Sequence, residues 1–417
     1  MRRTLLIALT GSLSLSSIAA QTAHRPELTF VKVADTFTPV PGGVGTFGSF
    51  ADARDFDGRT AVFNGTDGAA REGLYAFRNG ALELLVNEDT LVPDAAQSFT
   101  IFFDVAVQGS MVAFTGGWPG GSSAGCQFSP NEGVFAVALG TQTPLTLADS
   151  DSSDFRCFHG VDLNSGQVVV TGGNDPVDVF HNHQESVLRI DGLHLLSSLV
   201  STAQAVPGGG GATFAGFDQE VALRGGKLCV GNVVPNSIPP LSGIYLDDGV
   251  LRVVADGTTP VPGGTGTFQD LRGMNYDGRE VAFRGTDANG FSGIYVGTGP
   301  GDLRVAVNRS TPVPGTPFNF LGFSNPMAYA DGVLAFTGFW AGGGIGLFLW
   351  RRTPGQERGK VERVLVKGDT IDGNTVEQAF AYAGQLVGNR MLIRVIYQGF
   401  TESGLYVAKL PFPVLLR

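Results

Sequence analysis

Short runs in which apolar and polar residues alternate recur along almost the whole chain, separated by glycine-containing turns. In the first copy, residues 47–56 form one run, Asp57-Gly58 is a two-residue hairpin signal, and residues 59–63 form the next run. A loop at residues 64–68 leads to a third run at 73–77, and a turn leads to a fourth at 82–86. β-branched and aromatic residues are frequent in these runs, and no 3.6-residue periodicity is sustained. The pattern predicts units of four antiparallel strands and no substantial helix.

The unit occurs seven times. A turn glycine follows the first strand of each unit, and these glycines lie roughly 50–60 residues apart: Gly58, Gly109, Gly166, Gly226, Gly278, Gly332 and Gly388. A Gly-aliphatic-aromatic triplet begins the third strand of six units, at Gly73, Gly133, Gly243, Gly293, Gly346 and Gly404. A period in this range indicates an array of one supersecondary unit, in which no single unit is stable alone.

Seven four-stranded units predict an all-β fold, a seven-bladed β-propeller. Residues 28–33 match a fourth strand but precede the first complete unit, whereas the last unit ends after its third strand at 404–410. We therefore expect the N-terminal strand to be the outer strand of the last blade, which closes the ring and removes an unpaired edge. The expected domain spans residues 28–410, with blades at about 44–90, 99–148, 154–203, 212–257, 266–309, 318–369 and 378–410 plus 28–35, followed by a tail at 411–417.

The N-terminus has the pattern of a secretory signal peptide. Arg2 and Arg3 precede an apolar stretch at 5–18, and small residues near Ala20 offer a cleavage site, so we predict a signal peptide at residues 1–20. The alternative is an uncleaved anchor, but the stretch is short and rich in Ser and Thr. No second apolar run of spanning length follows. We expect a monomer without a membrane span after cleavage, secreted or periplasmic.

Composition narrows the classes of partner. Charged residues are 16% of the chain, glycines number 61 and the formal net charge is −10. Low charge with many glycines is typical of short strands and tight turns rather than of disorder. Nucleic acid binding requires a basic patch that this chain lacks.

The turn glycine followed by Val-Ala-Phe, and then by Gly-Ile-Tyr, resembles a family of secreted bacterial proteins with tandem NxxGxVAFxA-type repeats. The matching segments are Asp57-Gly58 with Ala61-Val62-Phe63, Gly109 with Val112-Ala113-Phe114, Asp277-Gly278 with Val281-Ala282-Phe283, and Gly332 with Leu334-Ala335-Phe336. The resemblance spans nearly all of residues 28–410 and implies a propeller and export, but no activity. This chain departs from the family in lacking a C-terminal anchor and, in most repeats, the leading Asn.

The third unit differs most from the others. In a four-strand meander, the loop leading into the first strand and the loop between the second and third strands share one face, which we call the upper face. In unit three these loops, 149–159 and 174–183, are polar, and the triplet glycine is replaced by Ser186. Three of the five histidines, His159, His181 and His183, therefore fall on one face of one blade.

Two functional interpretations of this cluster stand beside a structural one. One histidine acts as a general base while Arg156 neutralises a substrate carboxylate, as a polysaccharide lyase requires. Alternatively, His181 and His183 bind a metal together with Asp175, Asp178 or His159. The structural alternative is a solvated polar loop with unrelated histidines. Because H-x-H in a loop is a weak signal and the chain has no HExxH, GxSxG, phosphate-loop or CxxC motif, we predict no metal and no cofactor.

The cysteines allow a more specific prediction. Cys126 lies in the long upper loop of unit two, and Cys157 lies where unit three enters its first strand, on the same face of the neighbouring blade. A disulfide between them suits an exported protein. Cys229 resembles a buried free thiol in a second strand. The alternative is that all three cysteines are unpaired.

Two further groups are candidate ligand-binding residues. First strands line the central channel of a propeller, and they carry Arg54, Arg272, Asp104 and Asp162, together with Asp52, Glu220 and Asn325. These side chains bind a ligand, or they satisfy one another across a wet channel. Trp118 and Trp340 in the upper loops stack on sugar rings, or they pack within their blades.

The leading functional hypothesis is a secreted or periplasmic scaffold, without enzymatic activity, that binds a glycan or an extracellular protein through its upper face. The alternative is a carbohydrate-active enzyme, a polysaccharide lyase or glycoside hydrolase, that uses the His-rich third blade. The net negative charge argues against a polyanionic substrate.

Overall fold

The computed structural model describes residues 28–119, 131–173, 185–191, 195–217, 220–232, 242–352 and 359–411. Its regular elements are thirty β-strands, and the described residues contain no helix. Accordingly, none of these residues belongs to a helix long and apolar enough to span a membrane. The expectation of an all-β chain is confirmed.

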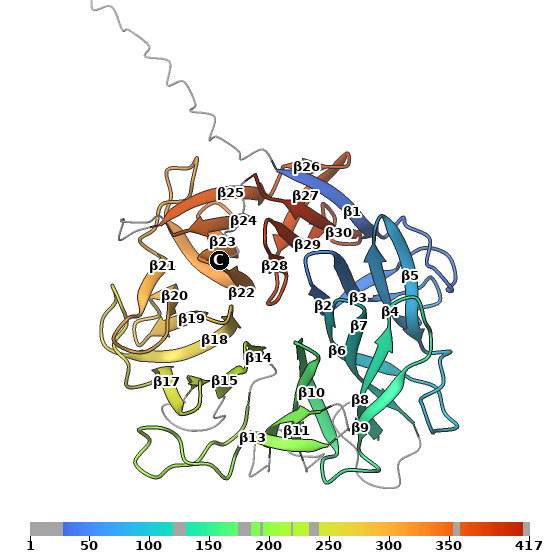
Figure 1. The fold of residues 1–417 in the computed structure, drawn as a ribbon. Helices are drawn as coiled ribbons and strands as arrows, with labels where there is room; N and C mark the ends of the chain where they lie inside the picture. The colour runs from blue at the N-terminus through green and yellow to red at the C-terminus, as the bar shows by residue number, and fades with distance from the viewer. Residues whose placement is uncertain are drawn as a thin grey trace, which may run out of the picture.

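The strands form seven antiparallel sheets arranged in a ring, and the strands nearest the centre are β2, β6, β10, β14, β18, β22 and β28 (Figure 1). This arrangement confirms the seven-bladed propeller with four strands per blade. Blade 1 consists of β2 (Ser49–Phe56), β3 (Thr60–Thr66), β4 (Glu72–Arg78) and β5 (Ala81–Asn87). Blade 2 consists of β6 (Ile101–Gln108), β7 (Met111–Trp118), β8 (Asn131–Ala138) and β9 (Leu145–Asp149). Blade 3 consists of β10 (Cys157–Asn164), β11 (Gln167–Gly173), β12 (Glu185–Ile190) and β13 (Leu196–Ser201).

Blades 4 to 6 repeat the same order from the centre outwards. Blade 4 consists of β14 (Val221–Arg224), β15 (Lys227–Asn232), β16 (Gly243–Asp247) and β17 (Leu251–Asp256). Blade 5 consists of β18 (Phe268–Tyr276), β19 (Val281–Asp287), β20 (Ser292–Gly297) and β21 (Arg304–Asn308). Blade 6 consists of β22 (Phe320–Ala330), β23 (Val333–Trp340), β24 (Gly344–Arg351) and β25 (Lys360–Val366).

Blade 7 is built from both ends of the chain. Its C-terminal part contains β26 (Thr370–Ile371), β27 (Asn374–Phe380), β28 (Leu386–Val387), β29 (Arg390–Tyr397) and β30 (Ser403–Lys409). β1 (Thr29–Asp35) pairs with β30 in antiparallel register, from Thr29 opposite Lys409 to Asp35 opposite Gly404. As predicted, the N-terminal strand completes the last blade, so that β30 is not left as an exposed edge.

The repeat motifs are core residues. In blade 1 the ring of Phe47 contacts the ring of Tyr75 edge-on, with centroids 4.9 Å apart, and Phe63 lies beside both. A side chain at Gly65 would lie 2.9 Å from Phe47, and one at the triplet glycine Gly73 would lie 2.8 Å from the Tyr75 hydroxyl. The glycines are therefore required because aromatic rings fill the space above them.

Adjacent blades are joined by buried or half-buried polar contacts near the upper face. A carboxylate at the start of the third strand accepts a hydrogen bond from a backbone N–H of the next blade's first strand or its approach. These bonds join Phe102 to Glu72 (3.3 Å), Phe158 to Glu132 (2.9 Å) and Phe217 to Glu185 (2.7 Å). Burial raises the pKa of Glu132 to about 7. The position before the triplet glycine thus connects one blade to the next.

Candidate functional site

A central cavity of about 720 Å³ is the main candidate site among the described residues. It is lined by the inner strands of blades 1 to 5 and by the break between β27 and β28 in blade 7. Its volume lies in the range of about 300–1,000 Å³ that small-ligand sites occupy. Its lining includes the polar and aromatic residues Arg54, Asp55, Asp104, His159, Asp162, Glu220, Arg224 and Tyr382.

Irregular inner strands shape this cavity. The pairing register shifts in β2 between Phe50 and Arg54, in β6 between Phe102 and Asp104, and in β10 between His159 and Val161. In blade 7 the inner strand is interrupted outright, because β27 and β28 pair separately with β29. Bulges of this kind bend a strand and redirect its side chains, and they are frequent beside active sites.

The cavity carboxylates have a repeated structural contact. One oxygen of each accepts a hydrogen bond from a backbone N–H in the next blade's inner strand. These bonds run from Val107 to Asp55 (2.8 Å), from Val161 to Asp104 (2.8 Å) and from Leu223 to Asp162 (2.7 Å), and Met274 donates to Glu220 in the same way. In Asp104 and Asp162, the other carboxylate oxygen accepts a hydrogen bond from the N–H of the following residue, Val105 or Leu163. The channel acids therefore hold neighbouring blades together.

Burial shifts the acid–base properties of the cavity. It raises the pKa of Asp55 to about 7 and that of Asp104 to about 6, and in both cases the negative charge of Asp162 adds to the effect. Burial also lowers the pKa of His159, so its imidazole is neutral at pH 7. Arg224 forms an ion pair with Asp162. The cavity thus combines carboxyl groups that titrate near neutral pH with an uncharged histidine.

Arg54 and Tyr382 meet where the ring closes. The Arg54 guanidinium lies over the Tyr382 ring, 3.9 Å from its centroid, and also donates to the Ala51 carbonyl. The fully buried Gln385 holds this contact in place: its Oε1 accepts from the Tyr382 backbone N–H (3.2 Å), and its Nε2 donates to the Arg54 carbonyl (3.4 Å). The broken inner strand of blade 7 thereby contacts the bulged inner strand of blade 1.

The structure separates two members of the predicted third-blade cluster. His159 lines the central cavity. Arg156 lies before β10 at an exposed position and is not among the cavity-lining residues. His181, His183, Asp175, Asp178 and Cys126 lie outside the described residues, so the convergence of the histidines and the Cys126–Cys157 disulfide stay predictions. Over the described ranges, no group of three His, Cys, Asp or Glu side chains is arranged to hold a metal ion. Cys229 is buried and free, as expected.

The other predicted ligand-binding residues lie away from the cavity. Trp118 is buried, and its ring meets Phe135 edge-on at 5.9 Å between centroids. Trp340 meets Phe348 in the same way at 5.8 Å. Each tryptophan thus packs on the aromatic residue of its own blade's triplet. Arg272 is mostly exposed and pairs with Asp270 at 2.8 Å.

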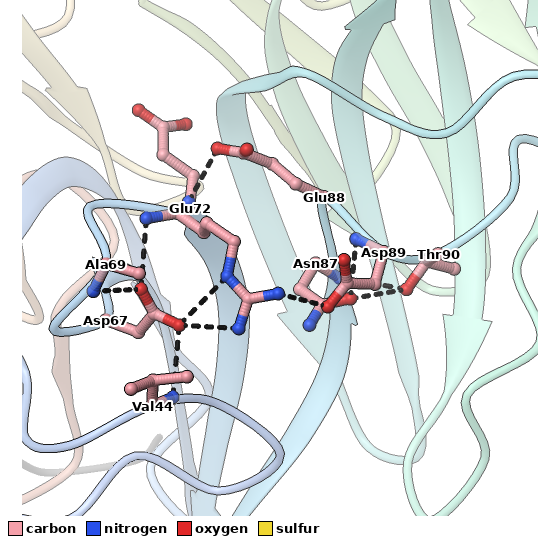
Figure 2. Close-up of polar contacts among 9 residues, drawn as sticks. Val44, Asp67, Ala69, Glu72, Asn87, Glu88, Asp89 and Thr90 are labelled. Atoms are coloured by element: carbon pink, nitrogen blue, oxygen red, sulfur yellow. Dashed lines mark hydrogen bonds and ion pairs between the residues drawn. The ribbon is translucent and has the colours of Figure 1, made fainter.

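The upper loop of blade 1 contains the sequence Gly65-Thr66-Asp67, which recurs in blade 5 as Gly285-Thr286-Asp287, and Figure 2 shows the contacts of its aspartate. Asp67 accepts hydrogen bonds from the backbone N–H groups of Val44 (3.1 Å) and Ala69 (2.8 Å) and from the Arg71 side chain (2.8 Å). Burial alone would raise its pKa, but these bonds lower it to about 2. Arg71 also forms an ion pair with Asp89 after β5. In blade 5, Asp287 accepts from Asn289 and Phe291, each at 2.8 Å, so this sequence organises the loop.

Sequence reasoning missed the exposed aromatic residues. Phe37, Phe318 and Phe400 are 55%, 41% and 62% exposed, and all three lie in upper-face segments, between β1 and β2, before β22, and between β29 and β30. The tryptophans attracted attention by residue type, whereas exposure depends on loop conformation. The available signal was a phenylalanine in a loop where blade 5 has Gly290.

Comparison with known proteins identifies a family but no activity. The model of a family of unknown function (DUF7453) matches residues 11–372. The chain belongs to this family. A search of curated proteins finds no significant match. The export and the NxxGxVAFxA repeat type implied by the resemblance stay predictions.

Solved structures share the fold. The β-propeller domain of the trilobed protease from Pyrococcus furiosus is 11% identical, with 88% of this chain and 98% of that chain covered and a TM-score of 0.51. A polysaccharide lyase of family PL25, an ulvan lyase, is 9% identical, with 93% and 97% covered and a TM-score of 0.51. At such identities the likeness shows a common propeller architecture and nothing about function.

Proposed function

We propose that this member of the DUF7453 family is an extracytoplasmic binding scaffold that holds a glycan at its upper face and in the central cavity. The observation that carries the proposal is the cavity itself, about 720 Å³, lined by carboxylates, His159 and the Arg54–Tyr382 pair. Carboxylate oxygens keep lone pairs after accepting one backbone N–H each, and these accept sugar hydroxyls well. Tyr382 adds an aromatic surface.

Binding accounts for this geometry better than catalysis does. Asp55, Asp104 and Asp162 already hold adjacent blades together, so moving or removing them would disturb the ring. The lining has more acids than arginines, which disfavours a polyanionic ligand and favours a neutral glycan. A recessed cavity also suits an extended chain of sugars better than the broad face of a folded protein.

A carbohydrate-active enzyme is the second candidate, and one observation favours it. His159 is neutral at pH 7, as a general base must be, and it shares the cavity with Asp104, whose pKa is about 6. Groups with pKa values near the working pH are effective proton carriers. In this version the His-rich loop of blade 3 would supply His181 and His183. The fold shared with an ulvan lyase supports a propeller as a framework for such chemistry, by analogy only.

The test is a panel of soluble oligosaccharides and peptides, with binding measured by isothermal titration calorimetry. We expect Tyr382→Ala and His159→Ala to weaken glycan binding about tenfold, whereas Arg272→Ala, outside the cavity, leaves it unchanged. Equal binding by wild type and both cavity variants rejects the cavity as the site. Products with wild type but not with His159→Ala, including unsaturated uronates detected by absorbance, favour the enzyme.

Export and the disulfide have their own tests. N-terminal sequencing of the protein recovered from the periplasm or medium should begin near residue 21. We propose the Cys126–Cys157 disulfide because Cys157 begins β10, where the next residue, Phe158, bonds to Glu132, six residues after Cys126 in the chain. Thiol labelling of the denatured, unreduced protein should then find one reactive cysteine, Cys229. Three labelled cysteines reject the pairing.

A further inference from the structure

The upper loops of blades 1, 5 and 7 share one backbone turn. In each, a residue in the left-handed conformation donates its N–H to the carbonyl three residues earlier: Ala70 to Asp67 (2.9 Å), Gly290 to Asp287 (3.0 Å) and Phe400 to Tyr397 (3.1 Å). Their φ angles are 62°, 72° and 61°. Phe400 therefore occupies a position that blade 5 fills with glycine and blade 1 with alanine.

A phenylalanine at this position is costly. The left-handed conformation costs a residue with a side chain about 1–2 kcal/mol, and for a bulky residue it is a true outlier. Phe400 gains little from packing in return, because it is 62% exposed. Backbone strain without a packing gain points to a function outside the fold.

A second exposed phenyl ring, that of Phe37, lies at the upper edge of blade 7, which we call its upper rim. Phe37 is 55% exposed and follows β1, the outer strand of blade 7. The neighbouring Thr36 donates its backbone N–H to the Ser403 carbonyl at 3.0 Å, which joins this segment to the end of the Phe400 loop. Phe37 and Phe400 thus come from two segments that meet at the upper rim of blade 7.

Blade 1 fills the matching position with charge. Its equivalent bond runs from the Glu88 N–H to the Glu72 carbonyl (3.2 Å), and the residue that corresponds to Phe37 is Asp89. Asp89 forms an ion pair with Arg71 of the upper loop (Figure 2). The same backbone frame therefore carries an ion pair in blade 1 and two exposed phenyl rings in blade 7.

We propose that Phe37 and Phe400, the blade 7 platform, stack on a sugar ring of a neutral glycan. The C–H groups on one face of a pyranose are weakly positive and match the negative face of a phenyl ring. Exposed polar residues, Gln398 and Thr401, flank Phe400 and reach the hydroxyls at the sugar's edge. Glu402 borders the platform with negative charge, which disfavours sulfated or uronic sugars.

The size and rigidity of the platform favour a sugar over a protein. A specific protein interface buries at least about 1,000 Å² in total, more than two phenyl rings supply. The loop is held by the Phe400 bond to Tyr397 and by the Tyr397 N–H bond to the Glu402 carbonyl (3.0 Å). A ring that is already held in place loses little entropy on binding. The platform lies outside the central cavity, and the inference rests on the glycan binding proposed above for the upper face.

Calorimetry and pull-down with neutral hexasaccharides and their insoluble polymers test this site. Phe400→Gly introduces the residue found at the same position in blade 5, and Phe37→Asp introduces the one found in blade 1. Both residues are therefore compatible with the existing loop conformation. We expect each to weaken binding of a neutral glycan at least fivefold. Phe318→Ser, which removes an exposed ring from blade 6, should leave binding unchanged. The unfolding midpoint of Phe400→Gly should equal or exceed that of wild type.

Several results overturn the platform. They are wild-type protein that binds no neutral glycan, platform variants that bind like wild type, an equal loss with Phe318→Ser, and tighter binding of sulfated or uronic sugars. Loss of binding to a protein rather than to glycans also overturns it. If Tyr382→Ala abolishes glycan binding while the platform variants do not change it, the cavity stands and the platform fails. The reverse result supports the platform and rejects the cavity.

Discussion

The upper loops of blades 1 and 7 both reverse the chain around a left-handed residue, Ala70 in one and Phe400 in the other. Around Ala70, Asp67 and Arg71 form a dense polar network that extends to Asp89. Around Phe400, the corresponding rim exposes two phenyl rings. Because both loops share the bond from the left-handed residue to the carbonyl three residues earlier, the main difference lies in the side chains. A repeat protein thus keeps its frame in every blade and can change the surface of one blade without altering the ring.

The largest effect is expected from the feature that only blade 7 has, its assembly from both chain ends. Deleting residues 28–35 removes β1 and uncovers the whole of β30, including the buried Tyr406 and Leu405, which pair with Lys32 and Ala34. We expect loss of cooperative unfolding and aggregation through the exposed edge. Differential scanning calorimetry and light scattering check this. A monomeric variant with the wild-type unfolding midpoint would show that blade 7 does not need its outer strand.

The next effect concerns the polar network of blade 1. Asp67→Ala removes one carboxylate acceptor from several backbone and arginine donors and should cost about 2–3 kcal/mol of unfolding free energy. The pKa of Asp67 is lowered, so its stabilisation is present above about pH 4 and is lost as the pH falls toward 2. Denaturation at several pH values should show a shallower acid decline for the variant. Asp287→Ala, without an arginine partner, is the matched control and should cost less.

The fold could be predicted from sequence because its markers act locally. Gly65 and Gly73 are needed where Phe47 and Tyr75 pack, so glycine and aromatic positions recur together in every clear copy. The partner of a cavity carboxylate is not local: Asp55 accepts from Val107 in the next blade, and nothing in the neighbouring sequence marks that contact. Asp104 and Asp162 were correctly placed on inner strands, whereas Asp55 was not singled out, and the role of all three between blades required the structure.

The rim of blade 7 escaped prediction for a different reason. Its loop closes with a bond from Tyr397 N–H to Glu402, five residues on, whereas Asp67 and Asp287 close their loops four residues on. Counted from the turn glycines Gly58 and Gly388, Phe400 falls beside Ala70, but counted back from the triplet glycines Gly73 and Gly404 it is displaced by one residue. The sequence therefore marks the position of Phe400 ambiguously, and its left-handed φ angle became visible only in the structure.

A smaller effect is expected where blades 1 and 7 meet at the cavity. The pKa of Asp55 is raised to about 7, so the folded state binds its proton more tightly than the unfolded chain does. Wild-type stability should therefore fall as the pH rises from about 4 to 7. Asp55→Asn keeps an acceptor for Val107 and should reduce that slope, with a gain on the order of 1–2 kcal/mol at pH 8. Equal slopes for both proteins would mean that Asp55 is ionised throughout.

The smallest effect is expected for the unfolding free energy of Phe400→Gly. This prediction bears most directly on the comparison of blades 1 and 7. If Phe400 is held in a strained conformation for a purpose other than folding, glycine should relieve the strain and raise the unfolding free energy by about 1 kcal/mol. Ala70→Gly in blade 1 relieves a milder strain but also loosens the unfolded chain, so its effect should be near zero. Urea titrations of both variants measure the difference. A destabilised Phe400→Gly would show that the ring supports the fold, and blade 7 would then differ from blade 1 in packing rather than in function.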